Sequence, residues 1–123
     1  MTLPTNASER KNIPIFTGLI KYFPDALVAV AECSKAGGEQ HNPGKPLTWD
    51  RSKSSDELDA LTRHLLECGT IDSDGIRHSA KVAWRALANL QKEIEASRLE
   101  SQNQYEEPWE AIGSYIVSLM NKE

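Results

Sequence analysis

The most constraining feature of this sequence is an apolar repeat past its middle that only a helix can place on one face. Six small or aliphatic residues follow one another at spacings of four and three: Ile76, Ala80, Ala83, Leu87, Leu90 and Ile94. This period predicts a long amphipathic helix. Its two alanines are small enough to let a neighbouring helix come close.

A shorter helix is predicted just before it, over residues 54–69. Four apolar residues at spacings of three, four and three indicate its buried face: Leu58, Leu61, Leu65 and Cys68. Ser54 with Glu57 has the spacing of a capping box, and Gly69 is typical of a helix end. The polar turn TIDSDG follows, in which Asp74 is the expected cap of the next helix.

The flanking segments complete an all-α antiparallel bundle of about four helices. A helix is predicted to begin at Pro24 and to end at Gly37-Gly38. Residues 1–12 are polar and expected to fray, and residues 13–23 are expected to form an extended arm or short turn that places Ile15, Phe16, Ile20 and Phe23 on the core. Three regions are therefore predicted: a flexible segment 1–15, a helical domain 16–100, and a linker with a C-terminal amphipathic helix over 101–123.

Composition excludes several classes of protein. The chain has 123 residues, 39% of them hydrophobic, and a net charge of -4 with a pI of about 5.4. An acidic chain of one domain's length is not expected to coat nucleic acid. No window reaches the roughly 18 apolar residues of a membrane helix, and the N-terminus lacks signal-peptide order, so a cytoplasmic protein is expected. Isolated Cys33 and Cys68 are then expected to be buried thiols.

The predicted 76–94 helix also carries a polar stripe. His78, Lys81, Arg85 and Asn89 lie at spacings of three, four and four, and the stripe contains no acid. A solvated face of an acidic protein would normally mix charges of both signs. The bias indicates an anionic ligand, with an ordinary solvated face as the alternative.

The preceding helix carries acids on one side, Asp56 and Asp59, with Arg63 four residues after Asp59. The plain alternative is a surface ion pair between Asp59 and Arg63, worth a few tenths of a kcal/mol. If the two helices pack antiparallel, the acids would face the cations, which suits a divalent metal holding a phosphorylated ligand. Carboxylates favour Mg²⁺ or Mn²⁺, because the nearest pair of zinc-type ligands is only His64 with Cys68.

A long loop over residues 37–53 contains two glycines and a Pro-Gly pair. Loops of this length in a compact domain are often functional. The plain alternative is a surface excursion pinned by Trp49 in the core. The sequence contains no P-loop, no nucleophile elbow and no dinucleotide fingerprint.

The two central helices also resemble a known family. The run D-A-x-x-R-H at residues 59–64, an acidic turn with Asp72, and then H-x-x-x-x-A-x-x-x-x-x-N at residues 78–89 is similar to the dATP/dGTP diphosphohydrolase N-terminal domain of phages and bacteria. That family is similar in turn to the MazG-like all-α nucleotide pyrophosphohydrolases. The resemblance spans roughly Phe16 to Leu90.

The resemblance implies a fold and a reaction. MazG-like enzymes are helical dimers or tetramers that use magnesium to cleave a nucleoside triphosphate into the monophosphate and pyrophosphate. Their metal ligands follow the patterns E-x-x-E and E-x-x-D. Here Asp56 and Asp59 match the second pattern in kind, whereas Glu32 and Glu39, seven residues apart, match the first only loosely.

Roles for individual residues follow from the resemblance alone. Mg²⁺ or Mn²⁺ would be held by Glu32, Glu39, Asp56 and Asp59, with His64 and His78 orienting the catalytic acids. The nucleotide would be bound by Trp49, Arg63, Lys81, Arg85 and Asn89. The expected protein is a homodimer or homotetramer that hydrolyses a purine (deoxy)nucleoside triphosphate. Two alternatives stay open: a phage anti-defence protein that sequesters a nucleotide without cleaving it, and an oligomerisation domain built on the Trp109–Met120 helix.

Overall fold

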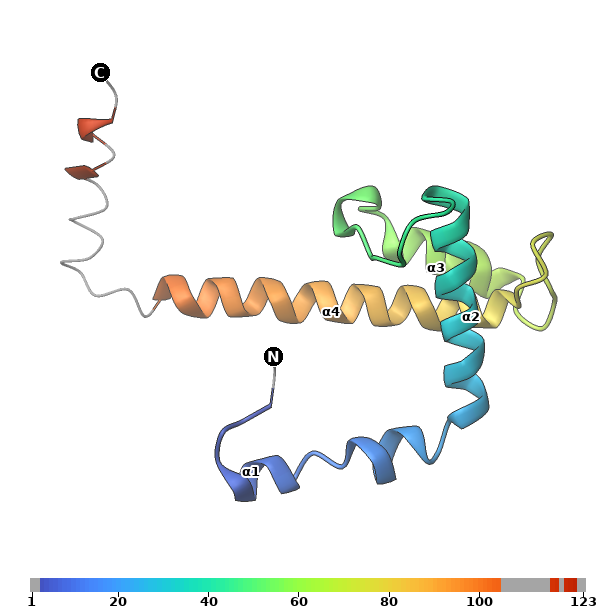
Figure 1. Ribbon diagram of the computed structural model, residues 1–123, viewed down its shortest axis with the longest axis horizontal. Coiled ribbons are helices and arrows are strands. Elements are labelled where there is room, and N and C mark those ends of the chain that lie inside the picture. Colours follow the sequence, from blue (N-terminus) through green and yellow to red (C-terminus); the bar gives the residue numbers. More distant parts are fainter. Residues whose placement is uncertain (1–2, 105–115, 118, 122–123) are drawn as a thin grey trace. The chain divides into compact units, whose positions relative to one another are not determined.

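The computed structural model describes residues 3–104, 116–117 and 119–121, and these residues form helices without any strand (Figure 1). In chain order the four α-helices are α1 (Ala7–Lys11), α2 (Pro24–His41), α3 (Glu57–Leu66) and α4 (His78–Gln104). A π-helical turn, Phe16–Ile20, and a 3-10 turn, Arg51–Lys53, lie between them. The predicted all-α class is therefore confirmed, and the described residues contain four α-helices, of which α1 was not predicted.

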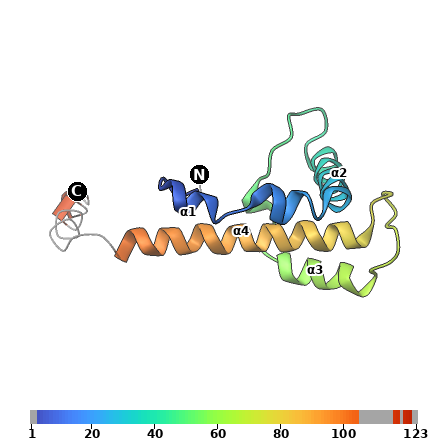
Figure 2. The same ribbon diagram turned by 90° about the horizontal axis from the view of Figure 1, so that it is seen from below.

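The chain divides into two compact units, residues 1–87 and 88–123, and α4 runs through the boundary. Within the first unit, α3 and the beginning of α4 lie side by side in both views (Figure 1, Figure 2). The turn between them is closed by an isolated bridge between Ile71 and Arg77. Gly69 and Gly75 have φ of 92° and 83°, a backbone conformation that side chains rarely tolerate. Helix α3 ends at Leu66, three residues before the predicted stop at Gly69, which takes its positive φ in the turn that follows.

Helix α2 begins at Pro24 as predicted, but it does not end at Gly37-Gly38. It continues through both glycines to His41, and the Asn42 N–H then donates to the Gly38 carbonyl. A Cβ at Gly38 would collide with the side chain of Leu47. The glycine therefore provides room for the returning loop, and the loop is shorter than the sequence predicted.

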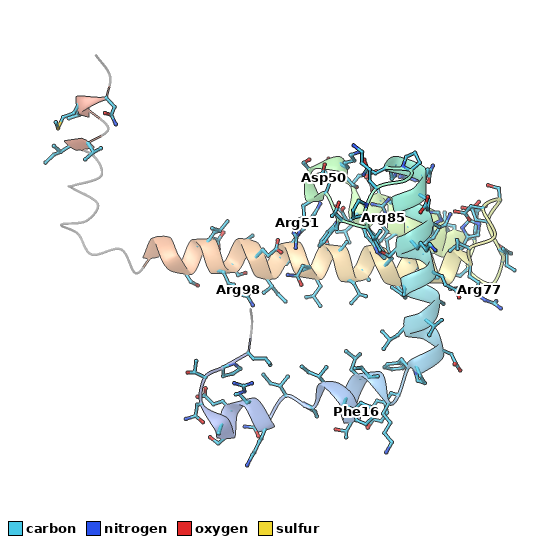
Figure 3. The ribbon with its side chains drawn as sticks, in the orientation of Figure 1. Phe16, Asp50, Arg51, Arg77, Arg85 and Arg98 are labelled. Atoms are coloured by element: carbon cyan, nitrogen blue, oxygen red, sulfur yellow. The ribbon has the colours of Figure 1, made fainter. Side chains whose placement is uncertain are left out.

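The N-terminal segment also differs from the prediction. Residues 7–11, expected to fray, form α1, whose first N–H groups donate to the side chain of Asn6. The segment 16–20 is a π-helical turn, which agrees with the short turn and not with the extended arm of the two predicted alternatives. Its side chains were expected on the core, yet Phe16 is 64% exposed (Figure 3).

The start of α3 corrects the predicted capping box. Asp56, not Ser54, is the N-cap residue, and the Ser54 hydroxyl donates to the Asp56 carboxylate. The Glu57 side chain lies 3.8 Å from the guanidinium of Arg85 on α4. The predicted capping box fails because Asp56 is the cap, so Glu57 is the first residue of α3 and not the third residue after the cap.

Burial follows the small and polar residues rather than the large aliphatic ones. The buried residues in the described part of the chain are Glu57, Ala60, His78, Ala80 and Ala88. Leu58, Leu65 and Cys68, predicted to form the buried face of α3, are exposed, as are Leu87 and Leu90 on α4. Alanines allow close approach, so the covered face of α3 is the one that carries Ala60.

Two further predictions concern the C-terminal helix and the absence of a membrane-spanning helix. The predicted helix over residues 108–120 lies largely outside the described residues. In the described ranges no single helix is long and apolar enough to span a membrane, although Ala7–Ile20 and Pro24–His41, bent by 86°, pass together on length and composition alone.

Candidate functional site

A cavity of about 540 Å³ lies within the first unit, walled by α2, the loop after it, α3 and the beginning of α4. Its lining combines acids, cations and indole rings. The groups with chemistry to offer are Asp56, Glu57, Asp74, Lys81, Arg85, Trp49 and Trp84. Arg85 extends from α4 toward the loop that carries Asp50 and Arg51 (Figure 3). The predicted acids-to-cations arrangement is therefore present in part.

Lys81 lies one helical turn before Arg85 and is held by the turn that precedes α4. Its ammonium donates to Asp72 at 2.6 Å and to Asp74 at 2.8 Å. The hydrogen bond from Lys81 lowers the pKa of Asp72 to about 2. Burial acts to lower the pKa of Lys81, but the two carboxylates outweigh burial, so that pKa is raised. The lysine is consequently a fixed positive charge at the cavity wall.

Glu57 is a functional candidate that the sequence reasoning missed. It is only 6% exposed, lines the cavity, and lies 3.8 Å from Arg85, whose guanidinium also donates to the Ser54 hydroxyl at 3.1 Å. A signal was available, because Glu57, Ala60 and His64 share one helical face at spacings of three and four. The capping-box interpretation of Glu57 hid it.

The two aspartates of α3 have different surroundings. Asp56 lines the cavity and accepts from Arg63 at 3.1 Å, and the hydrogen bonds from Arg63 and Ser54 lower its pKa. The alternative pairing of Arg63 with Asp59 was wrong, since Arg63 reaches back seven residues to Asp56. Asp59 is exposed and does not line the cavity. Its role as a ligand stays a prediction.

Two tryptophans form an aromatic wall. Trp49 of the loop and Trp84 of α4 meet edge to face, with their ring centroids 5.8 Å apart. The Arg51 guanidinium lies 4.2 Å from the Trp49 ring centroid. Trp49 was predicted to bind the ligand, and Trp84, three residues after Lys81, was missed because it lies between the polar and apolar stripes.

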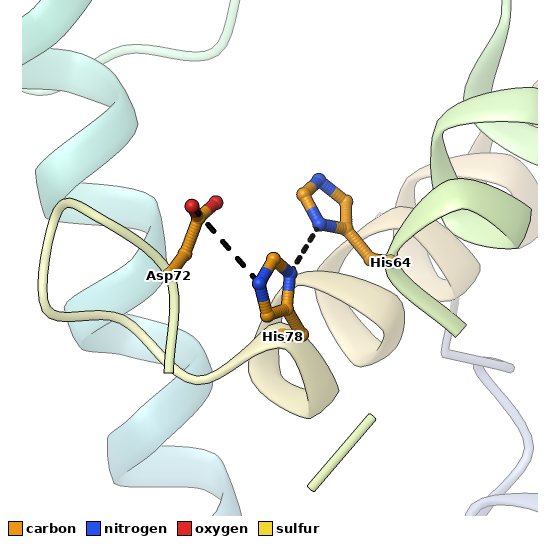
Figure 4. A group of neighbouring side chains, drawn as sticks. All are labelled: His64, Asp72 and His78. Carbon is orange, nitrogen blue, oxygen red and sulfur yellow. Dashed lines mark hydrogen bonds and ion pairs between the residues drawn. The ribbon is translucent and has the colours of Figure 1, made fainter. Parts of the chain in front are cut away.

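Three further side chains come together where α3, the turn and α4 meet. The Nδ1 atoms of His64 and His78 are 2.9 Å apart, and His78 Nε2 lies 4.0 Å from Asp72 (Figure 4). In the described part of the chain this is the group of His, Cys, Asp and Glu side chains able to hold a metal. Burial, followed by the charge of Lys81, lowers the pKa of His64. The sequence suggested Cys68 as the partner of His64, but Cys68 is exposed.

The other predicted site residues lie elsewhere. Glu32 is exposed, and Glu39 is exposed at a second cavity of about 430 Å³. Asn89 donates to the Glu93 side chain at 2.9 Å. The four acids predicted as metal ligands, Glu32, Glu39, Asp56 and Asp59, are therefore not gathered around one cavity of this chain.

The cysteines give no nucleophile. Cys33 and Cys68 are both free, and the exposed Cys68 contradicts the predicted buried thiol. Cys33 lines the cavity, and burial raises the pKa of its thiol. A raised pKa leaves less thiolate near neutral pH, so the thiol is unsuited to attack on phosphorus.

Comparison with known proteins gives one family. The family model described as dATP/dGTP diphosphohydrolase, N-terminal, matches residues 5–102, which include the whole cavity lining and the histidine cluster. No curated protein and no solved structure matches the chain.

Proposed function

The chain belongs to the dATP/dGTP diphosphohydrolase N-terminal family, and from this premise we propose that it is a metal-dependent pyrophosphohydrolase of purine (deoxy)nucleoside triphosphates. It would release pyrophosphate and leave the monophosphate. The observation that carries the proposal is a cavity whose lining combines carboxylates, cations and two indole rings. Its volume of about 540 Å³ is in the range of small-molecule sites.

The cavity charges support a phosphorylated ligand bound together with a cation. Four carboxylates and three cationic side chains line it, so a bare triphosphate would meet a net negative surface. A divalent metal removes that repulsion. Carboxylate oxygens are the ligands that Mg²⁺ and Mn²⁺ prefer, and Asp56, Glu57 and Asp74 are the cavity acids that could supply them. Such a metal polarises phosphoryl oxygens and activates water.

The ion pairs of the cavity support the same ligand. Glu57 lies near Arg85 and Asp74 pairs with Lys81 in the cavity lining, and Asp56 of the lining pairs with Arg63, which lies outside it. A metal–triphosphate complex can satisfy both members of each pair, because the acids can turn to the metal and the cations to phosphate oxygens. Arg85 is suited to bidentate contacts with phosphate. Binding would then exchange partners without leaving a buried charge uncompensated.

The purine would lie against Trp49 or Trp84, since base–aromatic stacking is worth about 1–3 kcal/mol. Asp59, Glu32 and Glu39 would take part only if a second copy of the chain brought them to the cavity. A homodimer or homotetramer is consistent with the many large hydrophobic side chains that this chain leaves exposed, including Leu58, Leu65 and Leu66 on α3. A cytoplasmic location is proposed on the substrate class.

The test is pyrophosphate release from dGTP, dATP and GTP with Mg²⁺ or Mn²⁺. The Arg85→Met variant should lose about 100-fold in kcat/KM, as is typical when a charge-stabilising group is removed. Arg98→Met, an exposed arginine on α4 outside the cavity, is the matched control. An absence of pyrophosphate from the whole nucleotide panel would reject the enzyme proposal.

Paired aspartate variants locate the site on α3. A greater loss in Asp56→Asn than in Asp59→Asn would support catalysis in this cavity. The reverse order would move the reaction to the exposed side of α3, where a second subunit would have to complete it.

A second candidate is nucleotide binding without hydrolysis. It is favoured by the absence of Glu32, Glu39 and Asp59 from the cavity lining, because three of the four acids that the resemblance assigns to the metals are then not in the cavity of this chain. Calorimetry separates the two functions. Tight binding of dGTP or dATP with no pyrophosphate formed would identify a sequestering protein.

A further inference from the structure

The histidine cluster is a second set of ligand atoms, distinct from the cavity carboxylates. Three consecutive elements supply it: His64 from α3, Asp72 from the turn, and His78 as the first residue of α4 (Figure 4). One ligand atom from each residue lies within 4.8 Å of the others. The turn fixes the position of His78 relative to the end of α3, because the His78 N–H donates to the Thr70 carbonyl at 3.1 Å.

We propose that His64, Asp72 and His78 bind a first-row transition-metal dication, in preference to Mg²⁺, at the edge of the cavity. Two imidazoles and one carboxylate are a donor set that Zn²⁺, Co²⁺ and Mn²⁺ accept, whereas Mg²⁺ favours oxygen ligands alone. Three protein ligands leave coordination positions open. Because His64 also lines the cavity, an open position would be reachable from it.

The spacing of the nitrogens suits an ion. Adjacent ligands about 2.1 Å from one metal are about 3.4 Å apart in a tetrahedral site and about 3.0 Å apart in an octahedral one. The His64 and His78 Nδ1 atoms are 2.9 Å apart, so only a small separation of the two rings is needed. Without metal, one of these nitrogens must carry a proton and donate to the other. Metal binding would replace that proton, so the histidine pair is an arrangement that a metal can use with little movement.

The charges around the cluster also suit a dication. Asp72, Asp74 and Glu67 contribute three carboxylates, Glu67 lying 3.6 Å from His78 Nε2, and Lys81 contributes one ammonium. The sum is two negative charges with neutral histidines. His78 is 6% exposed, and a buried ligand set is little screened by solvent.

Supporting hydrogen bonds fix the carboxylate. Asp72 accepts from the Ser73 N–H at 2.7 Å through one oxygen and from Lys81 at 2.6 Å through the other. Such outer contacts orient metal ligands and tune their affinity. Asp74, which also holds Lys81, would retain the ammonium when Asp72 turns to the ion.

The site is testable with metal alone, so it stands or falls separately from the hydrolysis proposed above. The full chain is stripped with EDTA and titrated with Zn²⁺, Co²⁺, Mn²⁺ or Mg²⁺ by calorimetry. One ion per chain should bind, with affinity falling from Zn²⁺ through Co²⁺ to Mn²⁺ and with Mg²⁺ weakest. The Co²⁺ complex should show visible absorption that reports nitrogen ligation.

Variants assign the ligands. His64→Gln, Asp72→Asn and His78→Gln should each weaken Zn²⁺ binding at least about tenfold and change the Co²⁺ spectrum. His41→Gln removes the remaining histidine of the chain, which lies outside the cluster, and should leave both unchanged. Circular dichroism checks folding, and if His78→Gln unfolds, the less buried His64→Gln decides.

Three results would overturn the proposal: no ion binds, Mg²⁺ binds as tightly as Zn²⁺, or His41→Gln weakens binding as much as the cluster variants. Loss of pyrophosphate release with retained Zn²⁺ binding would reject only the enzyme proposal. Retained pyrophosphate release with no binding of any transition metal would reject only this site.

Discussion

The two faces of α3 differ in a way that reverses the usual expectation. The face toward α4 carries Glu57, Ala60 and His64, and the first two are buried. The other face carries Leu58 and Leu65, which are 59% and 53% exposed. The single chain thus covers a polar network and leaves aliphatic side chains in solvent.

This difference indicates that one face of α3 forms a ligand site and that the other contacts another chain. Burying a charged group costs free energy unless partners compensate it, and Glu57 lies near Arg85 while His64 meets His78. Such a covered polar face is typical of a site. Exposed aliphatic side chains of this number are typical of a surface that another chain covers.

The polar face should be sensitive to the loss of one charge. Glu57→Gln should lower the free energy of unfolding by about 3 kcal/mol, because it leaves Arg85 without its nearest buried carboxylate. Urea denaturation measures the change, and Glu100→Gln on the exposed end of α4 is the control. A change in Glu57→Gln no larger than in the control would show that the carboxylate stabilises nothing.

The contact between the helices should also be sensitive to volume. Ala80 is 6% exposed on α4, so Ala80→Leu should lower the free energy of unfolding by about 2 kcal/mol through overpacking. Ala86→Leu, on the exposed side of the same helix, should change it by less than about 0.5 kcal/mol. Equal effects at both positions would mean that the covered face of α4 is wrongly identified.

The polar face should make stability depend on pH in metal-free protein. The pKa of His64 is lowered in the folded chain, first by burial and then by the charges of Lys81 and His78. Above the unfolded-state pKa of about 6.5 the imidazole is neutral in both states, so the free energy of unfolding does not change with pH through this group. As pH falls below that value the unfolded chain takes up the proton first, and the free energy of unfolding decreases.

Denaturation between pH 7 and 5 in EDTA measures this slope, and His64→Gln should flatten it, while exposed His41→Gln should not. The Asp72 contribution does not interfere. Its pKa is lowered to about 2 by Lys81, so its stabilisation is present above about pH 4 and is lost only as pH falls toward 2. If His64→Gln and the unchanged chain show the same pH dependence of the free energy of unfolding, His64 does not lie on the buried face.

The aliphatic face should respond least within one chain. Leu65→Gln should change the free energy of unfolding of the isolated chain by less than about 0.5 kcal/mol, because the side chain is already in solvent. The same variant should lower the mass measured by light scattering if a second copy covers this face. A large loss of stability at concentrations where the protein is monomeric would contradict the division of faces.

Much of the fold followed from local rules. Pro24 begins α2, Gly69 ends the turn region after α3 with positive φ, and the period from Ile76 predicts most of α4. The prediction that α2 ends at its glycines was wrong, because a glycine inside a helix can instead make room for a neighbour, as Gly38 does for Leu47 of the loop. The capping-box prediction was wrong because the cap is Asp56, which makes Glu57 the first residue of α3.

The candidate site could be predicted only in part. Lys81, Arg85, Asp56 and Trp49 were identified from spacing and resemblance, and they line one cavity. Glu57, Trp84 and the partnership of Asp72 with both histidines were not identified. Each of these depends on two elements meeting, and spacing along one element carries no such information.

The amino-acid sequence alone was enough to predict that this chain is helical, that α2 begins at Pro24, and that cations share one side of α4. Periodicity determines these features because it acts within a few residues of each position. Only the tertiary structure decided which side of each helix is covered. Alanine permits a close approach that leucine prevents, and the covered sides of α3 and α4 are those that carry the buried Ala60 and Ala80, together with the buried polar residues Glu57 and His78.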